Sequence, residues 1–153
     1  MEAGDVAARS TLLVPLGSTE QHGPHLPLST DTDIAVAIAD GAAAHRARVV
    51  VAPALPYGAS GEHAGFPGTL SIGQAALEQV AVELGRSADA FAAVVFVSGH
   101  GGNLEALRRA VRTLRTEGRR VAAWSPSRSV DAHAGRTETS MMLTVDPRLV
   151  RLE

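Results

Sequence analysis

Five of the six histidines in this chain lie in polar segments that are rich in glycine or proline and that also hold glutamate or aspartate. Imidazole nitrogens and carboxylate oxygens are the groups that hold divalent transition metals in proteins. These histidines belong to four separate segments, so they indicate a metal site assembled from several loops: His22, His25, His63, His100 and His133. The sixth, His45, stands in an Ala-rich stretch before Arg46 and is expected to be solvated.

The first of these segments has the spacing of a ligand pair. Glu20 and His22 are two residues apart, so in an extended segment both side chains leave the same face and can reach one or two ions. Asp31 stands at the start of a predicted helix, positioned to bridge. Taken singly, His22 or His25 is better explained as a loop histidine bonded to backbone. The combination with the other segments favours a metal site.

Composition excludes several other chemistries. The chain of 153 residues has no cysteine, and its basic residues are all arginine, which excludes disulfides, thiolate nucleophiles, sulfur ligands and Schiff-base lysines. Ser60 and Ser98 do not match the G-x-S-x-G elbow of serine hydrolases and are interpreted as structural. The sequence GHGGN has Leu104 where a dinucleotide-binding fingerprint needs its last glycine.

The charge and hydropathy of the chain also limit the classes of partner that it is expected to bind. The net charge is -2 and acidic and basic residues are interspersed, so nucleic-acid binding is not expected. No apolar run approaches the ~20 residues of a membrane span. The N-terminus lacks the basic and apolar regions of a signal peptide, and we therefore expect no membrane association and a cytoplasmic location.

Short apolar runs alternate with longer amphipathic stretches along the chain. The apolar runs predict strands buried on both faces: Thr11–Leu16, Arg48–Ala54, Ala92–Val97 and Arg120–Trp124. The longer stretches predict helices: Asp31–Ala47, Ser71–Ala88 and Asn103–Glu117. This alternation predicts a single α/β domain over residues 1–153, with a mainly parallel sheet and helices on both faces.

Helix boundary signals support these ranges. Thr30, Ser71 and Asn103 are candidate N-caps, and Gly118 is a candidate stop. In the third helix leucine and valine recur at three- and four-residue spacing while arginines take the other face. The histidine-bearing segments then follow the four strands in turn, at the carboxyl edge where open α/β sheets bind ligands.

Four motifs together resemble the creatininase family of metal-dependent amidohydrolases: GSTEQHGPHLPLSTD, GEHAGFPGT, GHGGN and HAGRTETS. The resemblance extends from about Thr11 to Val150. It implies a three-layer α/β/α fold, a homo-oligomer, and a site with two divalent ions, Zn, Fe or Mn, that hydrolyses C–N bonds of amides. It further implies metal ligation by Glu20, His22, a bridging Asp31 and His100.

Within the family, the motifs are most similar to the branch that acts on the modified mycofactocin precursor peptide. The resemblance implies that this peptide is the substrate and that its C-terminal Val-Tyr dipeptide is removed, with a metal-activated water as nucleophile and His133 as proton shuttle. Creatininase proper has a glutamate where this chain has Gly102, and Glu138 is the candidate replacement ligand. The alternatives are a creatininase or formamide hydrolase, or an inactive metal-binding remnant.

Further residues have weaker assignments. Glu62 is interpreted either as catalytic or as a surface pair with His63, which is itself a candidate for substrate binding. Trp124 either contacts the substrate or belongs to the core. Met141 and Met142 are expected in the core. Related chains continue past the DPRL segment, so we expect this one to be a C-terminally shortened domain whose activity is reduced.

Overall fold

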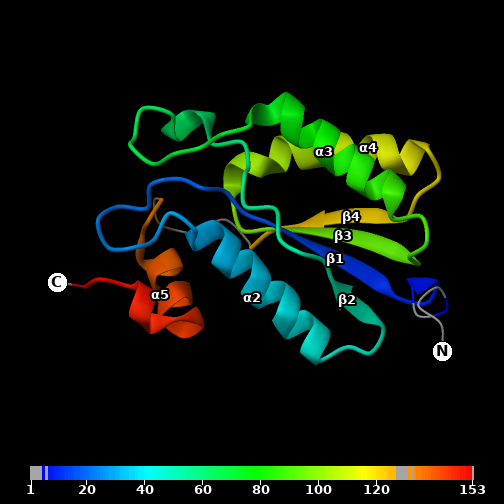
Figure 1. Cartoon of the computed structure of the whole chain (residues 1–153), viewed down its shortest axis with the longest axis horizontal. Coiled ribbons are helices and arrows are strands. Elements are labelled where there is room, and N and C mark those ends of the chain that lie inside the picture. Colours follow the sequence, from blue (N-terminus) through cyan, green and yellow to red (C-terminus); the bar gives the residue numbers. More distant parts are fainter. Residues whose placement is uncertain (1–4, 6, 127–130, 132, 153) are drawn as a thin grey trace.

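A four-stranded parallel sheet forms the centre of the computed structural model, which describes residue 5, residues 7–126, residue 131 and residues 133–152 (Figure 1). The strands lie in the order β2-β1-β3-β4. Their bounds are β1 (Thr11–Leu16), β2 (Val49–Val51), β3 (Ala93–Ser98) and β4 (Val121–Trp124). The four predicted strands and their parallel pairing are therefore confirmed.

The second strand is shorter than the predicted Arg48–Ala54. Arg48 has a positive φ of 65°, which turns the chain just before the strand. After Val51 the chain still runs beside β1, because the amide of Ala52 donates to the carbonyl of Leu13 at 2.8 Å. Pro53 has no N–H to continue the ladder, and regular pairing ends there.

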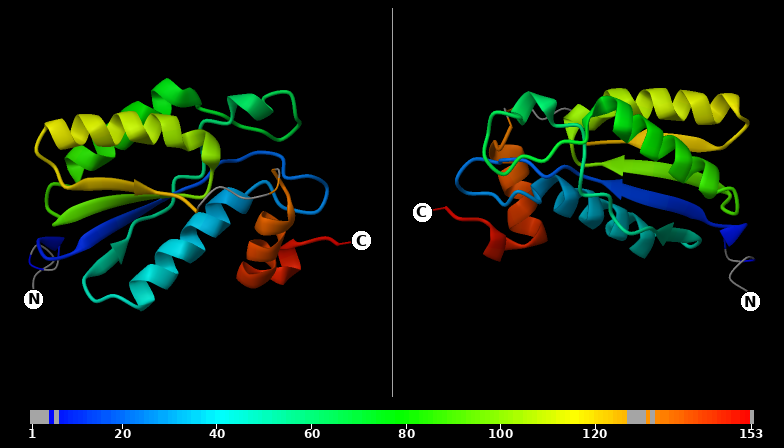
Figure 2. Two further views of the ribbon diagram at one scale, coloured as in Figure 1. Left: turned by 180° about the vertical axis from the view of Figure 1, so that it is seen from behind. Right: turned by 45° about the horizontal axis from the view of Figure 1, so that its top comes forward.

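Helices cover both faces of the sheet. Helices α3 (Gly73–Ser87) and α4 (Leu104–Thr116) lie on one face and α2 (Thr30–Ala44) lies on the other, with α5 (Arg136–Val145) beside α2 (Figures 1 and 2). This is the predicted three-layer α/β/α arrangement. Three short 3₁₀ helices complete the described elements: η1 (Gly61–His63), η2 (Gly101–Asn103) and η3 (Pro147–Leu149).

The core lies mainly between the sheet and the α3/α4 layer. Phe96 of β3 and Leu16 of β1 are fully buried there against Leu77, Leu107 and Leu114 of the helices. The predicted apolar stripe of α4 therefore faces the sheet. Met142 is buried in a smaller cluster with α2, as expected. No helix among the described residues combines the length and apolarity needed to span a membrane.

Two of the predicted N-caps are wrong. Ser29 is the N-cap of α2, and Thr30 is its first residue, with a hydroxyl that donates to the carbonyl of Pro27 at 2.7 Å. Helix α3 begins after Ile72, and the Ser71 hydroxyl accepts a hydrogen bond from the Ser60 amide. Asn103 does precede α4, but its side chain makes no capping bond. In each case the polar side chain is used in a loop.

The strand order places a crevice at the carboxyl ends of β1 and β3. The chain leaves β1 toward β2 on one side, and it enters β3 on the other side of β1. Connections diverge at such a point, and open α/β sheets bind ligands in the resulting crevice. The histidine-bearing segments meet here.

Candidate metal centre

Four buried side chains converge at the carboxyl ends of β1 and β3. Glu20 and His22 come from the loop after β1, Asp31 from the first turn of α2, and His100 from the second position after β3, next to Gly99. Gly99 lets α2 approach the sheet closely, because a Cβ at this position would overlap the backbone carbonyl of Asp31. The predicted convergence of the loops is thus found in the structure.

Asp31 lies between two imidazoles. Its Oδ1 is 3.2 Å from His22 Nε2, and its Oδ2 is 3.1 Å from His100 Nδ1. Glu20 Oε1 is 3.4 Å from the same His100 nitrogen. One carboxylate therefore faces two histidines on opposite oxygens, as a bridging ligand would.

Backbone and side-chain oxygens fix which nitrogen each histidine turns inward. His22 Nδ1 lies 3.1 Å from the Glu20 carbonyl, which can only accept, so Nε2 faces the cluster with its lone pair when the ring is neutral. His100 Nε2 lies 3.3 Å from the Ala59 carbonyl, which leaves Nδ1 inward in the same way. Both rings thus present one free nitrogen to the same space.

Several polar atoms of the cluster are buried without a hydrogen bond. They are Glu20 Oε1, Glu20 Oε2, His22 Nε2, Asp31 Oδ2 and His63 Nδ1. Leaving such groups unpaired is costly, and most buried polar atoms in proteins have partners. Ligand atoms of Glu20, His22 and Asp31 all lie within 4.8 Å of one another. The residues present therefore fit divalent ions held by nitrogen and oxygen, although the individual ligand assignments stay predictions.

In the metal-free protein, protons take the place of cations. Burial lowers the pKa of His100, but the adjacent Asp31 carboxylate, together with the negative charges of Glu20 and Glu62, outweighs it and raises this pKa to about 9. The pKa of His22 is raised for the same reason, since Asp31 outweighs desolvation. Burial raises the pKa of Asp31, but its two histidine partners outweigh this effect and lower it. Metal binding must displace these protons.

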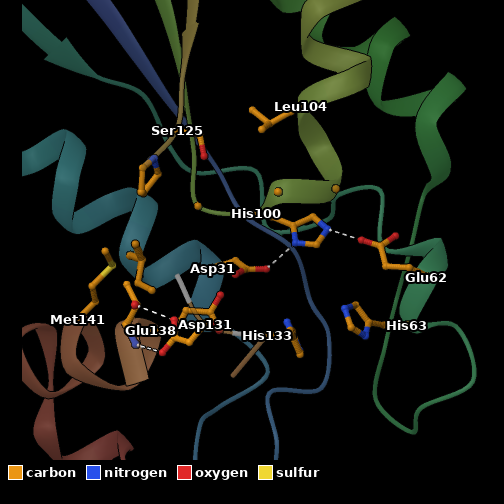
Figure 3. Close-up of a pocket in the computed structure, with 16 residues that line it drawn as sticks. Asp31, Glu62, His63, His100, Leu104, Ser125, Asp131, His133, Glu138 and Met141 are labelled. Carbon is orange, nitrogen blue, oxygen red and sulfur yellow. Dashed lines mark hydrogen bonds and ion pairs between the residues drawn. The ribbon is translucent and has the colours of Figure 1, made fainter. Parts of the chain in front are cut away.

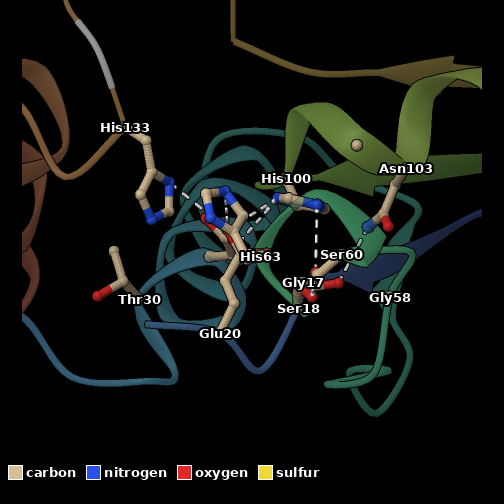
Figure 4. Close-up of polar contacts among 12 residues, drawn as sticks. Gly17, Ser18, Glu20, Thr30, Gly58, Ser60, His63, His100, Asn103 and His133 are labelled. Atoms are coloured by element: carbon tan, nitrogen blue, oxygen red, sulfur yellow. Dashed lines mark hydrogen bonds and ion pairs between the residues drawn. The ribbon is translucent and has the colours of Figure 1, made fainter. Parts of the chain in front are cut away.

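His133 lies at the edge of the cluster. Its Nδ1 is 3.5 Å from Glu20 Oε1, and its Nε2 donates to the Gln21 carbonyl at 2.5 Å. The ring stacks on His63 with centroids 4.1 Å apart and lies 4.3 Å from the ring of His22 (Figure 4). Because the Gln21 carbonyl fixes the proton on Nε2, the neutral ring keeps a free Nδ1 on the side of the cluster.

Glu138, a predicted metal ligand, lies beside His22. Its Oε2 accepts from the Ala134 amide at 2.6 Å and lies 3.9 Å from His22 Nε2. Gly102, where creatininase proper has a glutamate, has no room for a side chain: a Cβ would overlap His100 and lie 2.5 Å from Glu62 Oε1. The geometry supports Glu138 as the replacement.

A cavity of about 520 Å³ opens over the cluster (Figure 3). Asp31, His100, His133 and Glu138 line it together with Glu62 and His63, and Ile34, Leu104 and Met141 form an apolar part. The Glu62 side chain is 49% exposed, with Oε1 3.3 Å from His100 Nε2. Glu62 therefore contacts the cluster instead of pairing with His63.

Two predicted residues lie apart from the cluster. His25 bonds Thr139 Oγ1 through Nε2 at 2.9 Å and is explained as a loop histidine. Trp124 is 47% exposed at the end of β4, so it is not a core residue. The cavity lining includes Ser125 and Pro126, which follow it, and its role in substrate binding stays a prediction.

Sequence reasoning missed Asp131, which lines the cavity and accepts from the Thr137 amide at 2.9 Å and the Thr137 hydroxyl at 2.8 Å. It holds the start of α5, which carries Glu138. Asp131 lies six residues before Thr137 and is not the N-cap of α5, so the two- or three-residue spacing of a capping bond was not there to mark it.

Comparison with known proteins identifies the family. The model of the creatininase family, described as creatinine amidohydrolase, matches residues 1–153. The mycofactocin precursor peptide peptidase of Mycolicibacterium smegmatis (strain ATCC 700084 / mc(2)155) is 60% identical over 145 residues, which are 89% of this chain and 58% of that protein. The chain thus spans less than two thirds of that relative's length.

Solved structures agree with this result. A creatininase variant of the Zn-Zn type is 29% identical and aligns with a TM-score of 0.78, covering 94% of this chain and 67% of that one. A structure named creatininase Mn has a TM-score of 0.76 at 29% identity and covers 94% of this chain and 68% of that one. Sequence motifs, fold and family match agree, and the chain belongs to the creatininase family.

Proposed function

We propose that this chain carries the metal centre of an amidohydrolase that removes the C-terminal Val-Tyr dipeptide from the modified mycofactocin precursor peptide. The observation that carries the proposal is the group of buried ligand atoms without hydrogen bonds, on Glu20, His22 and Asp31, beneath a cavity of about 520 Å³. The name of the Mycolicibacterium smegmatis relative supports the choice of substrate.

The donor set suits two divalent ions. Glu20, His22, Asp31, His100 and Glu138 would hold these ions, and Asp31, which lies between His22 and His100, would be shared between them. Nitrogen and oxygen donors are compatible with Zn, Fe or Mn, and the Zn-Zn and Mn creatininases support two of these. When bound, such a pair of ions supplies an activated water and polarises an amide carbonyl.

His133 is assigned the proton transfer. The Gln21 carbonyl holds its Nε2 proton, so Nδ1 is free to take a proton from the attacking water and to deliver it to the leaving amine nitrogen. Glu62, at the exposed side of the cavity, is the second candidate for acid or base chemistry. His63, stacked on His133, would then contact the substrate beside the scissile bond.

The cavity favours a peptide over a very small amide. Its volume lies within the roughly 300–1,000 Å³ typical of pockets for drug-sized ligands. The apolar wall of Ile34, Leu104 and Met141 suits aliphatic or aromatic side chains of a peptide. Trp124, which precedes the cavity-lining residues Ser125 and Pro126, is a further proposed contact. Creatinine or a formamide remains the second candidate, supported by the family description.

The direct test is a comparison of substrates. The chain and the Mycolicibacterium smegmatis relative are each loaded with Zn, Fe or Mn and incubated with the matured peptide, with creatinine and with a formamide. Release of Val-Tyr, detected by mass spectrometry for both proteins, is the expected result. Hydrolysis of creatinine alone would transfer the assignment to the second candidate. Metal binding without hydrolysis of any of these, while the relative is active, would identify a metal-binding remnant.

We also propose that the protein is a cytoplasmic homo-oligomer. Light scattering on the purified protein and fractionation of cells test these two properties independently of the chemistry.

A further inference from the structure

We propose that Asn103 is a positioning residue that fastens three ligand-bearing loops to one another before any metal binds. The inference rests on the proposed metal centre. The position of Asn103 in the sequence predicts a helix cap, but in the structure its side chain bonds other groups. Asn103 is fully buried and occupies the N-cap position of α4 without making a capping hydrogen bond.

The hydrogen bonds of the Asn103 side-chain amide all go to groups outside α4. Its Oδ1 accepts from the Ala59 amide at 2.9 Å, and its Nδ2 donates to the Gly17 carbonyl at 2.9 Å (Figure 4). Nδ2 also lies 3.4 Å from Ser98 Oγ. Gly17 and Ala59 belong to the segments that follow β1 and β2, Ser98 is the last residue of β3, and Asn103 itself lies in the segment after β3. One side chain therefore connects three chain segments that are far apart in sequence.

Each connection leads to a residue of the metal centre. Gly17 begins the loop that carries Glu20, and the hydroxyl of Ser98 donates to the backbone carbonyl of His100 at 2.9 Å. Ala59 precedes the segment with Glu62 and His63, and its carbonyl is 3.3 Å from His100 Nε2. Fixing these three points sets the separation between the carboxylate of Glu20 and the ring of His100.

The loop held through Ala59 also orients His100. Ser60, the next residue, places its hydroxyl 3.3 Å from His100 Nε2 and pairs with the hydroxyl of Ser18 from the loop after β1. With Nε2 surrounded by these oxygens, Nδ1 turns toward Asp31 and Glu20. Partners of this kind around a ligating histidine set its ring orientation and its basicity.

Only an amide satisfies the site. Asparagine supplies an acceptor for the Ala59 amide and a donor for the Gly17 carbonyl, whereas aspartate cannot donate and leucine can do neither. The space is closed by Gly58, where a Cβ would overlap Asn103 Oδ1 and lie 2.6 Å from the Gly17 carbonyl. The close approach of three backbones therefore requires both residues.

The test compares metal binding in variants of the intact chain. Asn103→Asp and Asn103→Ala remove the donor to Gly17, and Gly58→Ala disturbs the same contact from the opposite side. Leu114→Ala is the control, because Leu114 is fully buried in the α3/α4 core against Gly85 of α3 and takes no part in the hydrogen bonds of Asn103. Zn²⁺ affinity is measured by calorimetry, and the ligand geometry by the visible absorption of the Co²⁺-substituted protein.

We expect the three loop variants to bind Zn²⁺ at least ~10-fold more weakly, as is typical when a partner of a ligand is lost, and to change the Co²⁺ spectrum. Leu114→Ala should lower the unfolding temperature and leave both readouts at the wild-type values. If the wild type binds Zn²⁺ and Asn103→Ala binds it equally well with the same Co²⁺ spectrum, this inference is wrong and the proposed function stands. If the wild type itself binds no divalent metal, the proposed function is wrong.

A measurement on the wild type covers the case in which the variants do not fold. In the metal-free protein, the Ala59 amide should exchange slowly with deuterium, because Asn103 Oδ1 holds it. Exchange at the rate of an exposed amide would show that the contact is absent before metal binds, and would overturn the inference.

Discussion

At the scale of single residues, the cluster is organised around one carboxylate. Asp31 is nearly fully buried and faces His22 on one oxygen and His100 on the other. Motif spacing predicted that these side chains lie together, because Glu20 and His22 are neighbours in one loop and His100 follows a strand; their roles as metal ligands stay predictions. The position of Glu62 against His100 was not predictable, because it depends on a loop of irregular backbone between β2 and α3.

Removing either partner of this carboxylate should remove metal. For His22→Ala and Asp31→Ala we expect loss of most of the close to two divalent ions per wild-type chain, since each residue is assigned to at least one ion. Elemental analysis after gentle purification measures this. His45→Ala, at an exposed position outside the cluster, is the matched control and should keep the wild-type content. Equal metal content in all four proteins would contradict the assignment.

Substitution of His133 should lower catalysis without removing metal. We expect His133→Ala to lower turnover by ~10²-fold or more, the effect of losing a general acid or base, while the metal content stays at the wild-type value. Steady-state kinetics with the matured peptide, combined with elemental analysis, measures both quantities. His25→Ala, in the same group of motifs but outside the cluster, should change neither. If His133→Ala loses metal, His133 is a ligand and not the proton shuttle.

At the scale of elements, helices and strands were predicted best where apolar residues recur at a regular spacing. The apolar stripe of α4 was identified because its side chains face the sheet, and the strands because their apolar side chains supply clusters on both faces of the sheet. Helix α5 was not among the predicted helices, because in it only Met142 is buried and no continuous stripe marks it. The caps of α2 and α3 were each misplaced by one residue: the Thr30 hydroxyl donates to the Pro27 carbonyl, and the Ser71 hydroxyl accepts from the Ser60 amide as well as from the Gly73 amide.

The approach of α2 to the end of β3 gives a prediction at this scale. Gly99→Ala places a Cβ against the carbonyl of Asp31 and should push the first turn of α2 away from the sheet. We expect a loss of about 1–3 kcal/mol in the free energy of unfolding, as for other overpacked sites, together with weaker Zn²⁺ binding. Denaturant unfolding and calorimetry measure the two effects.

Gly101→Ala is the matched control for this substitution. It lies in the same GHGGN motif, but nothing lies within 4 Å of a Cβ added there. Its unfolding free energy and Zn²⁺ affinity should stay close to those of the wild type. Equal behaviour of the two alanine variants would show that α2 does not depend on the glycine at position 99.

At the scale of the whole molecule, the alternating pattern was sufficient for the fold class and for the sheet edge that carries the site. The cavity was not predictable, because its lining combines residues from α2 and α5 with residues from the segments after β2, β3 and β4. The charge state of the buried cluster likewise follows from the assembled structure and not from any one segment. The stability of the whole chain should therefore report on that cluster.

The metal-free protein should become less stable as pH rises. The pKa of His100 is raised from its ordinary 6.5 to about 9, chiefly because the bond to Asp31 outweighs desolvation, so its contribution is complete below pH 6.5 and is lost as pH rises through 9. His22 acts in the same direction. The lowered pKa of Asp31 acts oppositely: its contribution is present above its ordinary 3.8 and is lost as pH falls further. Maximum stability is expected between these two limits.

Bound divalent metal should prevent the loss of stability that the metal-free protein shows as pH rises. Divalent ions displace the protons of His22 and His100, so the Zn²⁺-loaded chain should keep its unfolding temperature up to pH 9 and lose it on acidification as protons compete for the ligands. Thermal unfolding with chelator and with Zn²⁺, from pH 4 to 9, measures both curves.

For the metal-free wild type the loss of unfolding free energy between pH 6.5 and 9 should be on the order of 3 kcal/mol, since one pKa unit corresponds to about 1.4 kcal/mol. His100→Gln, which cannot titrate, should show a much flatter alkaline limb. A metal-free wild type whose stability is constant or rises over this range would mean that the buried histidines do not hold protons in place of metal.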